Sequence, residues 1–163
     1  MNNDAGKSLD DVMELLKKQH TAMLTTFDGD KLVSRPMGAQ EPDEDGTLWF
    51  FTQTGSEKAQ QIEADGRVNV TYADGDYLSV EGTAEVVQDV AKQRELWNPF
   101  AESWLQCKAE DPQVSLIKVT AHTIGYWDTP STAGSMISMV KGLITHTQPD
   151  GGESGVVDAD VQS

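Results

Sequence analysis

The chain has 163 residues, which fits one domain with a sizeable core and is too short for two full ones. Its 27 acidic and 12 basic residues give a formal net charge of -15, and a field of that sign repels nucleic acid and anionic membrane surfaces. The single cysteine, Cys107, excludes an intrachain disulfide, and no apolar run typical of a signal peptide or a membrane span occurs. We therefore expect a cytoplasmic protein that binds neither nucleic acid nor membrane.

The first predicted elements are a helix and a β-hairpin. Residues 1–7 are typical of a flexible N-terminal tail, and a capping-box pattern at residues 8–11 predicts a helix that ends near His20. Residues 21–37 predict a hairpin with its turn at Asp28-Gly29-Asp30. Pro36 has no N–H to donate, so its strand should lie at a sheet edge, end there or contain a bulge.

The middle of the chain predicts a strand, a short helix and a second hairpin. An aromatic strand at residues 48–52 leads into a turn at Gly55 and a helix that begins at Ser56. Asp65-Gly66 is expected to end this helix, with the glycine in the left-handed conformation. Two runs of alternating polarity follow, "RVNVTYA" and "YLSVEGTAEVVQ", and the "DGD" between them predicts a turn.

The last third predicts two helical segments and a long strand. A helix is expected from Asp89 to Trp97, a shorter one around Trp104, and one or two strands in "VSLIKVTAHTIGYWD". "SMISMVKGLI" predicts a short helix, and the acidic residues 147–163 predict a disordered tail. About six antiparallel strands with flanking helices indicate an α+β fold, a small closed or split β-barrel, in one domain at residues 8–146.

Residues 52–58 carry the clearest chemical signal. A helix N-terminus presents unpaired N–H groups and a partial positive charge, so it attracts anions. Thr52 and Ser56 add hydroxyl donors, and Lys58 adds a full charge. Lys58 is one of only two basic residues in the range 41–85, which contains eleven acids. This stretch therefore predicts a phosphate site.

Lys58 has a second interpretation, as an ordinary surface charge paired with Glu57 or Glu63. The neighbourhood favours the phosphate site, because Arg35 is expected to lie beside the aromatic strand in a hairpin. A guanidinium, a flat apolar wall and an anion site suit a ligand with an aromatic ring system at one end and a phosphate at the other. Flavin mononucleotide (FMN) and pyridoxal phosphate both meet this description, and the residues alone do not separate them.

The ordered motifs resemble a known family. The run "SRPM…LWFFTQTGSEKAQQIEADGRVNVTY" resembles the pyridoxamine-phosphate-oxidase-like flavoproteins, most closely the general stress protein 26 group. "YLSVEGTAEVV", "ELWNPFAESW" and "DPQVSLIKVTAHTIGYWD" continue the likeness in order, over roughly residues 8–130. The resemblance implies an FMN-binding split β-barrel, a homodimer with the flavin at the subunit interface, and FMN as cofactor, with FAD as an alternative.

The resemblance also implies which residues contact the cofactor. Arg35 and Met37 would lie along the isoalloxazine, Phe51 would lie beside it, and Ser56 and Lys58 would hold the phosphate. The full implied set is Arg35, Pro36, Met37, Phe51, Thr52, Ser56, Lys58, Trp104 and Trp127.

Three tryptophans are placed by the resemblance alone. Trp127, in "GYWD", matches the family's aromatic residue near the flavin pocket. Trp97 and Trp104 belong to the helical segment through which relatives reach across the dimer. The alternative for each tryptophan is packing in the core or in the dimer interface.

Departures from the family pattern bear on the reaction. Pyridoxamine phosphate oxidases place basic residues where this chain has Glu57 and, approximately, Gln40, and they carry an Arg- and His-containing motif near their end. After Trp127 this chain reads "DTPSTAGSMISMV", with neither residue type. The resemblance therefore implies a flavin-dependent oxidoreductase or flavin reductase-like protein that uses a nicotinamide donor, NAD(P)H, and not a true pyridoxamine phosphate oxidase.

Alternatives from other classes stay open. One alternative is a non-catalytic carrier or sensor of flavin or pyridoxal phosphate, which would also lack the Arg- and His-containing motif that binds substrate in the oxidases. Haem and deazaflavin binders share the barrel, and a haem would need a histidine such as His122 in the pocket. His20, His122 and His146 lack metal-ligand spacing, so no metal site is predicted, and no catalytic residue is assigned.

Overall fold

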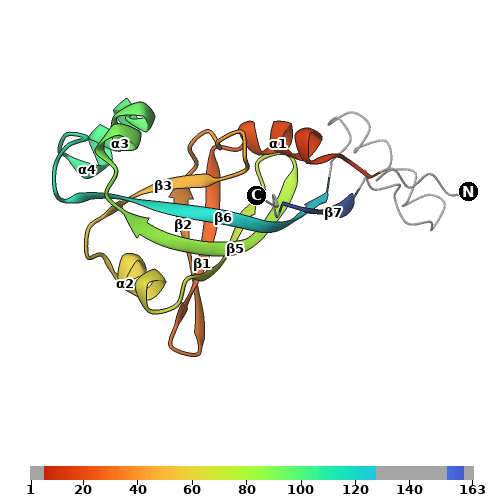
Figure 1. Cartoon of the computed structure of the whole chain (residues 1–163), viewed down its shortest axis with the longest axis horizontal. Coiled ribbons are helices and arrows are strands. Elements are labelled where there is room, and N and C mark those ends of the chain that lie inside the picture. Colours follow the sequence, from red (N-terminus) through yellow and green to blue (C-terminus); the bar gives the residue numbers. More distant parts are fainter. Residues whose placement is uncertain (1–5, 128–153, 160–163) are drawn as a thin grey trace, which may run out of the picture.

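The structure, a computed structural model, describes residues 6–127 and 154–159. The four described helices are α1 (Leu9–Lys17), α2 (Glu57–Ala64), α3 (Val90–Leu96) and α4 (Pro99–Leu105). The described strands are β1 (Thr21–Asp28), β2 (Lys31–Gly38), β3 (Leu48–Gln53), β4 (Arg67–Tyr72), β5 (Tyr77–Val87), β6 (Val114–Trp127) and β7 (Ser154–Asp158). Figure 1 shows α3 and α4 at one end of the sheet and β7 at the other. No helix in the described ranges is both long and apolar enough to cross a membrane.

The strands form one antiparallel sheet that curls without closing. Their order is β2-β1-β4-β5-β6-β3, and β7 pairs with the second half of β6. Within the described residues, no ladder joins β2 to β3, so the barrel is split along these two edges. The predicted α+β split β-barrel with antiparallel strands and flanking helices is confirmed.

The expected hairpin between the strand of Arg35 and the aromatic strand is wrong. Arg35 lies opposite Leu24 on β1, whereas Phe51 lies opposite Leu116 on β6. Residues 39–47 carry the chain from one edge of the sheet to the other edge. Because β2 and β3 follow each other in the sequence, direct pairing between them was predicted. Instead, the backbone groups of β3 form hydrogen bonds with β6, more than sixty residues away in the chain.

A bulge bends the two longest strands around the core. The β5–β6 register shifts between Glu81 and Gly82, which leaves His122 as the extra residue on β6. A Cβ added at Gly82 would lie 2.1 Å from the carbonyl oxygen of Thr120, a contact that no larger residue can make. The close approach of the two backbones at the bend therefore requires glycine.

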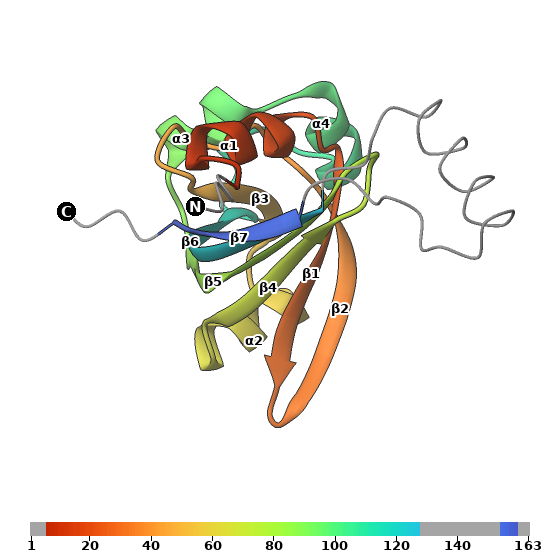
Figure 2. The ribbon, with the colours of Figure 1, turned by 90° about the vertical axis from the view of Figure 1, so that its right-hand side faces the viewer.

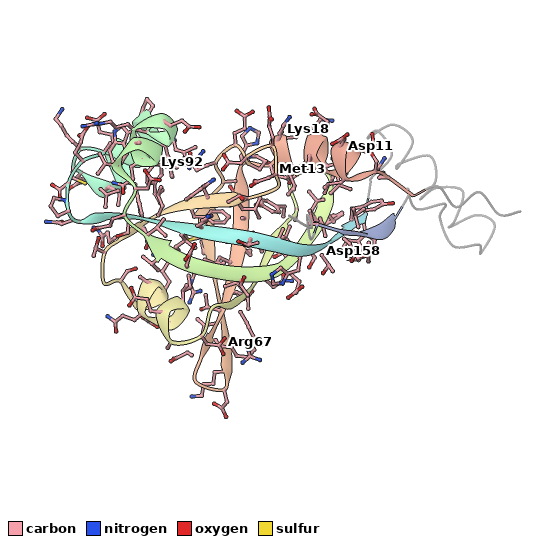
Figure 3. All side chains as sticks on the ribbon, viewed as in Figure 1. Asp11, Met13, Lys18, Arg67, Lys92 and Asp158 are labelled. Atoms are coloured by element: carbon pink, nitrogen blue, oxygen red, sulfur yellow. The ribbon has the colours of Figure 1, made fainter. Side chains whose placement is uncertain are left out.

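Two apolar clusters hold the elements together. The larger fills the barrel beneath α1, whose buried face contains Val12, Met13, Leu15 and Leu16. The smaller contains Trp49 and Phe51 of β3 with Ala101 and Leu105 of α4. Polar contacts also tie α3 to β3, because Lys92 (Figure 3) donates to Asp43, which in turn accepts from the indole N–H of Trp49.

Local helix signals are mostly confirmed. Ser8 and Asp11 form the predicted capping box, and Ser56 is the N-cap of α2. However, α1 ends at Lys17, before the expected His20. Gly66 is not left-handed; instead it lies against β5, where an added Cβ would be 2.9 Å from the carbonyl oxygen of Ala84.

The C-terminal residues contain a strand that the sequence did not predict. Disorder was expected for residues 147–163, but β7 pairs with β6 beside α1 (Figure 2). Val157 packs against the main core, and the Ala159 N–H donates to the His122 carbonyl at 2.7 Å. The helix expected at residues 135–144 lies outside the described residues, and the domain limits remain predictions.

Candidate functional site

A pocket of about 560 Å³ opens where the sheet is split. One wall comes from the end of β2, with Pro36 and Met37, and the opposite wall from Phe51 of β3. Trp104 of α4 and Lys58 of α2 also line the pocket. The pocket is therefore mainly apolar, with a charged group contributed by the first turn of a helix, which is the usual composition of a small-molecule site.

Helix α4 bridges the gap between the two sheet edges. Phe100 packs over the backbone of Gly38 on β2, and the side-chain amide of Asn98 donates to Gln40 at 3.0 Å. Ala101 of the same helix joins the cluster around Phe51 and also lines the pocket. Phe100 and Trp104 remain 67% and 52% exposed, so the helix offers two aromatic rings to the pocket.

Lys58 is a partly buried cation at one end of the pocket. Its ammonium lies 5.6 Å from the ring centroid of Trp104, and no described carboxylate lies within ion-pair distance. Burial lowers the pKa of Lys58, and the nearby Arg35 charge lowers it further, partly offset by Glu57. The surface ion pair considered from the sequence is therefore not formed.

Arg35 reaches across β1 toward helix α2 and is held by neutral groups. Its guanidinium donates to the Thr26 hydroxyl and to the side-chain oxygen of Gln61, each at 2.7 Å, and to the Leu24 carbonyl at 3.3 Å. The pKa of Arg35 is lowered by burial. Among described residues no carboxylate neutralises it directly, although Gln61 also donates to Glu57 at 3.1 Å.

The two predicted hydroxyls lie together at the start of α2. Thr52 is fully buried, and its hydroxyl is 2.9 Å from that of Ser56. The Ser56 oxygen also accepts from the Ala59 N–H at 3.4 Å, as expected for an N-cap. These contacts fix the helix start beside Lys58.

The nine predicted contact residues fall into three groups. Five line the pocket, namely Pro36, Met37, Phe51, Lys58 and Trp104. Arg35, Thr52 and Ser56 lie behind that lining, around the start of α2. Trp127 is half exposed at the far end of β6, opposite Tyr77, and does not line this pocket. All nine assignments remain predictions, because no ligand is present to test them.

Sequence reasoning missed several lining residues. Phe100 and Asn98 were passed over, although the pattern Asn-Pro at a helix start is recognisable. His20 was treated as an isolated histidine, yet it lines the pocket beside Thr21 and its imidazole contacts Asp74 at 2.9 Å. His122, which a haem would need, lies instead beside Glu81 and outside the pocket lining.

Residues 7–150 match the family model described as "Pyridoxamine 5'-phosphate oxidase like", so the chain belongs to that family. Within it, the structure is similar to a putative general stress protein 26 from Jannaschia sp. CCS1, with 26% identity and a TM-score of 0.73, covering 90% of this chain and 94% of that one. It is also similar to General Stress Protein 26 from Bacillus anthracis str. Sterne, with 33% identity and a TM-score of 0.64, covering 71% and 89%.

Two further relatives extend the comparison. A general stress FMN/FAD binding protein from Xanthomonas citri is 27% identical with a TM-score of 0.63, covering 74% of this chain and 88% of that one. The Neurospora crassa protein bli-3 is 29% identical over 154 residues, which cover 85% of this chain and 74% of bli-3. The chain is therefore a general-stress-type member of the family.

Proposed function

We propose that this protein binds FMN, with FAD as an alternative, and transfers electrons from a nicotinamide donor. The observation that carries the proposal is the pair of partly buried cations, Lys58 and Arg35, at one end of an apolar pocket. Neither forms an ion pair with a described carboxylate, in a chain with a net charge of -15. The similarity to an FMN/FAD binding protein supports the choice of ligand.

The charges at this end suit a phosphate dianion. Two neighbouring cations repel each other and are costly to bury without a counter-ion. A phosphate beside Lys58 would relieve both costs, and the N-terminus of α2 would add its N–H groups and its dipole. Ser56 and Thr52 supply hydroxyls at the same place. These residues fit the phosphate of FMN.

The remaining walls suit a planar ring. Met37 and Phe51 are buried beneath the pocket, and Trp104 and Phe100 remain exposed in it. Exposed aromatic side chains in a pocket gain apolar contact area when a flat ring covers them. A bound flavin would supply hydride and electron chemistry, while these side chains would orient its ring and exclude water.

A homodimer with the flavin at its interface is part of the proposal. Trp127 lies eleven residues along β6 from Leu116, the partner of Phe51, which corresponds to about 36 Å of strand at the usual rise. We therefore assign its predicted flavin contact to the pocket of a second subunit. Met23, Tyr77 and Trp127 are 41%, 54% and 51% exposed on the sheet, and a partner would cover them.

The first test is the identity of the bound molecule. We expect gently purified protein to show flavin absorbance, or to quench the fluorescence of added FMN with saturation at one flavin per subunit. Heat or acid release followed by chromatography distinguishes FMN from FAD and from pyridoxal phosphate. Light scattering of the same sample checks the dimer. A colourless protein that takes up neither flavin would refute the proposal.

Turnover separates an oxidoreductase from a carrier. With bound flavin, we expect NADH or NADPH to bleach the flavin absorbance anaerobically and air to restore it. Binding without bleaching by either nucleotide would favour the non-catalytic flavin carrier or sensor. Pyridoxine phosphate and pyridoxamine phosphate, the substrates of a true oxidase, should give no turnover.

A further inference from the structure

A histidine and an aspartate form a hydrogen-bonded pair at the exposed edge of the pocket. His20 directly precedes β1, and Asp74 lies in the turn between β4 and β5. The Nδ1 atom of His20 is 2.9 Å from Oδ2 of Asp74, and the histidine lines the same pocket as Lys58. Nothing in the proposed function uses this pair.

Hydrogen bonds hold the backbone at both members of the pair. The backbone N–H of Asp74 donates to the side-chain oxygen of Gln19 at 3.1 Å, and the Gln19 amide donates to the Leu15 carbonyl. Gln19 is 5% exposed, so this link is buried. The carbonyl of His20 accepts from the Ala39 N–H at 2.9 Å. The backbones of His20 and Asp74 are therefore tied to the end of β2 and, through Gln19, to α1, while the imidazole itself contacts Asp74.

The contact with Asp74 defines which ring nitrogen is free. A carboxylate accepts hydrogen bonds, so the neutral imidazole carries its proton on Nδ1 and presents Nε2 as an acceptor. The side chain of His20 is 84% exposed, and Nε2 has no partner among the described residues. A ligand that reaches this edge of the pocket meets a hydrogen-bond acceptor with a set orientation.

His20 and Arg35 lie at opposite ends of the same segment at the end of β2, and Lys58 of α2 lies near Arg35. Arg35 marks the cationic end, and His20 is bonded to Ala39, four residues further along the chain. Four residues of strand span about 13 Å. Pro36 and Met37, which line the apolar middle of the pocket, lie between these ends. The pocket thus has a cationic end, an apolar middle and an acceptor end.

We propose that His20 binds the polar edge of the flavin ring, with its Nε2 accepting a hydrogen bond from the imide N–H, and that Asp74 is the positioning residue. This assignment rests on the proposed function. The oxidised isoalloxazine carries a single N–H, on the imide between its two carbonyls. With the phosphate at Lys58, a polar edge directed away from the phosphate reaches toward His20. No proton or electron is transferred in this contact.

The test compares FMN with N3-methyl-FMN, which lacks that N–H. In fluorescence titrations of the full chain, wild-type protein should bind FMN roughly tenfold more tightly than the methylated flavin. This ratio corresponds to the loss of one net hydrogen bond, which leaves the histidine acceptor unsatisfied. His20→Ala should reduce this ratio to about twofold or less. His122→Ala is the matched control, because His122 also faces a carboxylate but lies outside the pocket, and it should keep the wild-type ratio.

The role of Asp74 has a spectroscopic readout. Nitrogen-15 NMR of the imidazole should show the Nδ1-protonated form in wild type and a mixture of both neutral forms in Asp74→Ala, with a correspondingly smaller ratio of the two flavin affinities. Equal discrimination in wild type and His20→Ala overturns the assignment, as does equal affinity of wild type for both flavins. If FMN binds in that last case, the proposed function survives. Wild type that binds neither flavin removes both.

Discussion

Replacing Lys58 by alanine tests the phosphate end of the pocket most directly. The ammonium is partly buried, has no described carboxylate partner and lies in the first turn of α2. A hydrogen bond to a charged group contributes about 1.5–3 kcal/mol, and a tenfold change in Kd corresponds to about 1.4 kcal/mol. We therefore expect Lys58→Ala to weaken FMN binding by roughly 10- to 100-fold.

The assay is fluorescence titration of FMN and of riboflavin, which has no phosphate. Lys58→Ala should change riboflavin affinity by no more than about twofold. Any further change would come from the lost contact between the lysine and Trp104. Lys31→Ala is the matched control, since Lys31 is an exposed residue next to the β1–β2 turn and its removal changes the net charge equally. Equal FMN affinities of Lys58→Ala and Lys31→Ala would refute the assignment of Lys58 as the phosphate anchor.

Three further outcomes are expected. Burial lowers the pKa of Lys58, and a bound dianion would raise it again, so FMN affinity should fall as the pH rises through the pKa of the free lysine. The Lys58→Arg variant should keep its FMN affinity over this pH range. A wild-type affinity that stays constant up to pH 10.5, the usual lysine pKa, would contradict this prediction. Glu57→Gln removes a negative charge that interacts with both Arg35 and Lys58, and it should tighten FMN binding roughly two- to fivefold. Glu63 is an exposed acid of the same helix, and Glu63→Gln should leave FMN affinity unchanged. Equal effects of the two substitutions would show that only net charge matters. Gly82→Ala places a Cβ against the carbonyl oxygen of Thr120, and it should lower the free energy of unfolding by about 2 kcal/mol or more in urea denaturation. A loss below about 0.5 kcal/mol would mean that the bend relaxes easily.

Patterns between near neighbours in the chain were sufficient for most elements. The capping box at Ser8, the turn at Gly29 and the N-cap at Ser56 each depend on contacts within a few residues, and the structure contains all three. Pro36 lies on β2, an edge strand, as its missing N–H requires. The prediction of an anion site at the start of α2 is local in the same way, because it follows from the helix end itself.

Errors arose where a local pattern met a distant neighbour. Gly66 follows a helix and looked like a left-handed cap, but β5 lies so close that a side chain would not fit there. The acidic C-terminal run looked disordered, yet residues 154–158 pair with β6, and Val157 packs against the core. In both cases a contact partner far along the chain outweighed the local composition.

The sequence by itself determined most helices, the β1–β2 and β4–β5 hairpins, the position of a lysine in the first turn of α2 and, through its ordered motifs, the family. Only the tertiary structure decided that β3 pairs with β6 and leaves a gap beside β2, which α4 bridges to make the pocket. It also brought His20 to that pocket and Asp74 to His20. Local patterns report bonds between residues close in sequence, whereas a pocket depends on which sheet edges meet and which remain unpaired.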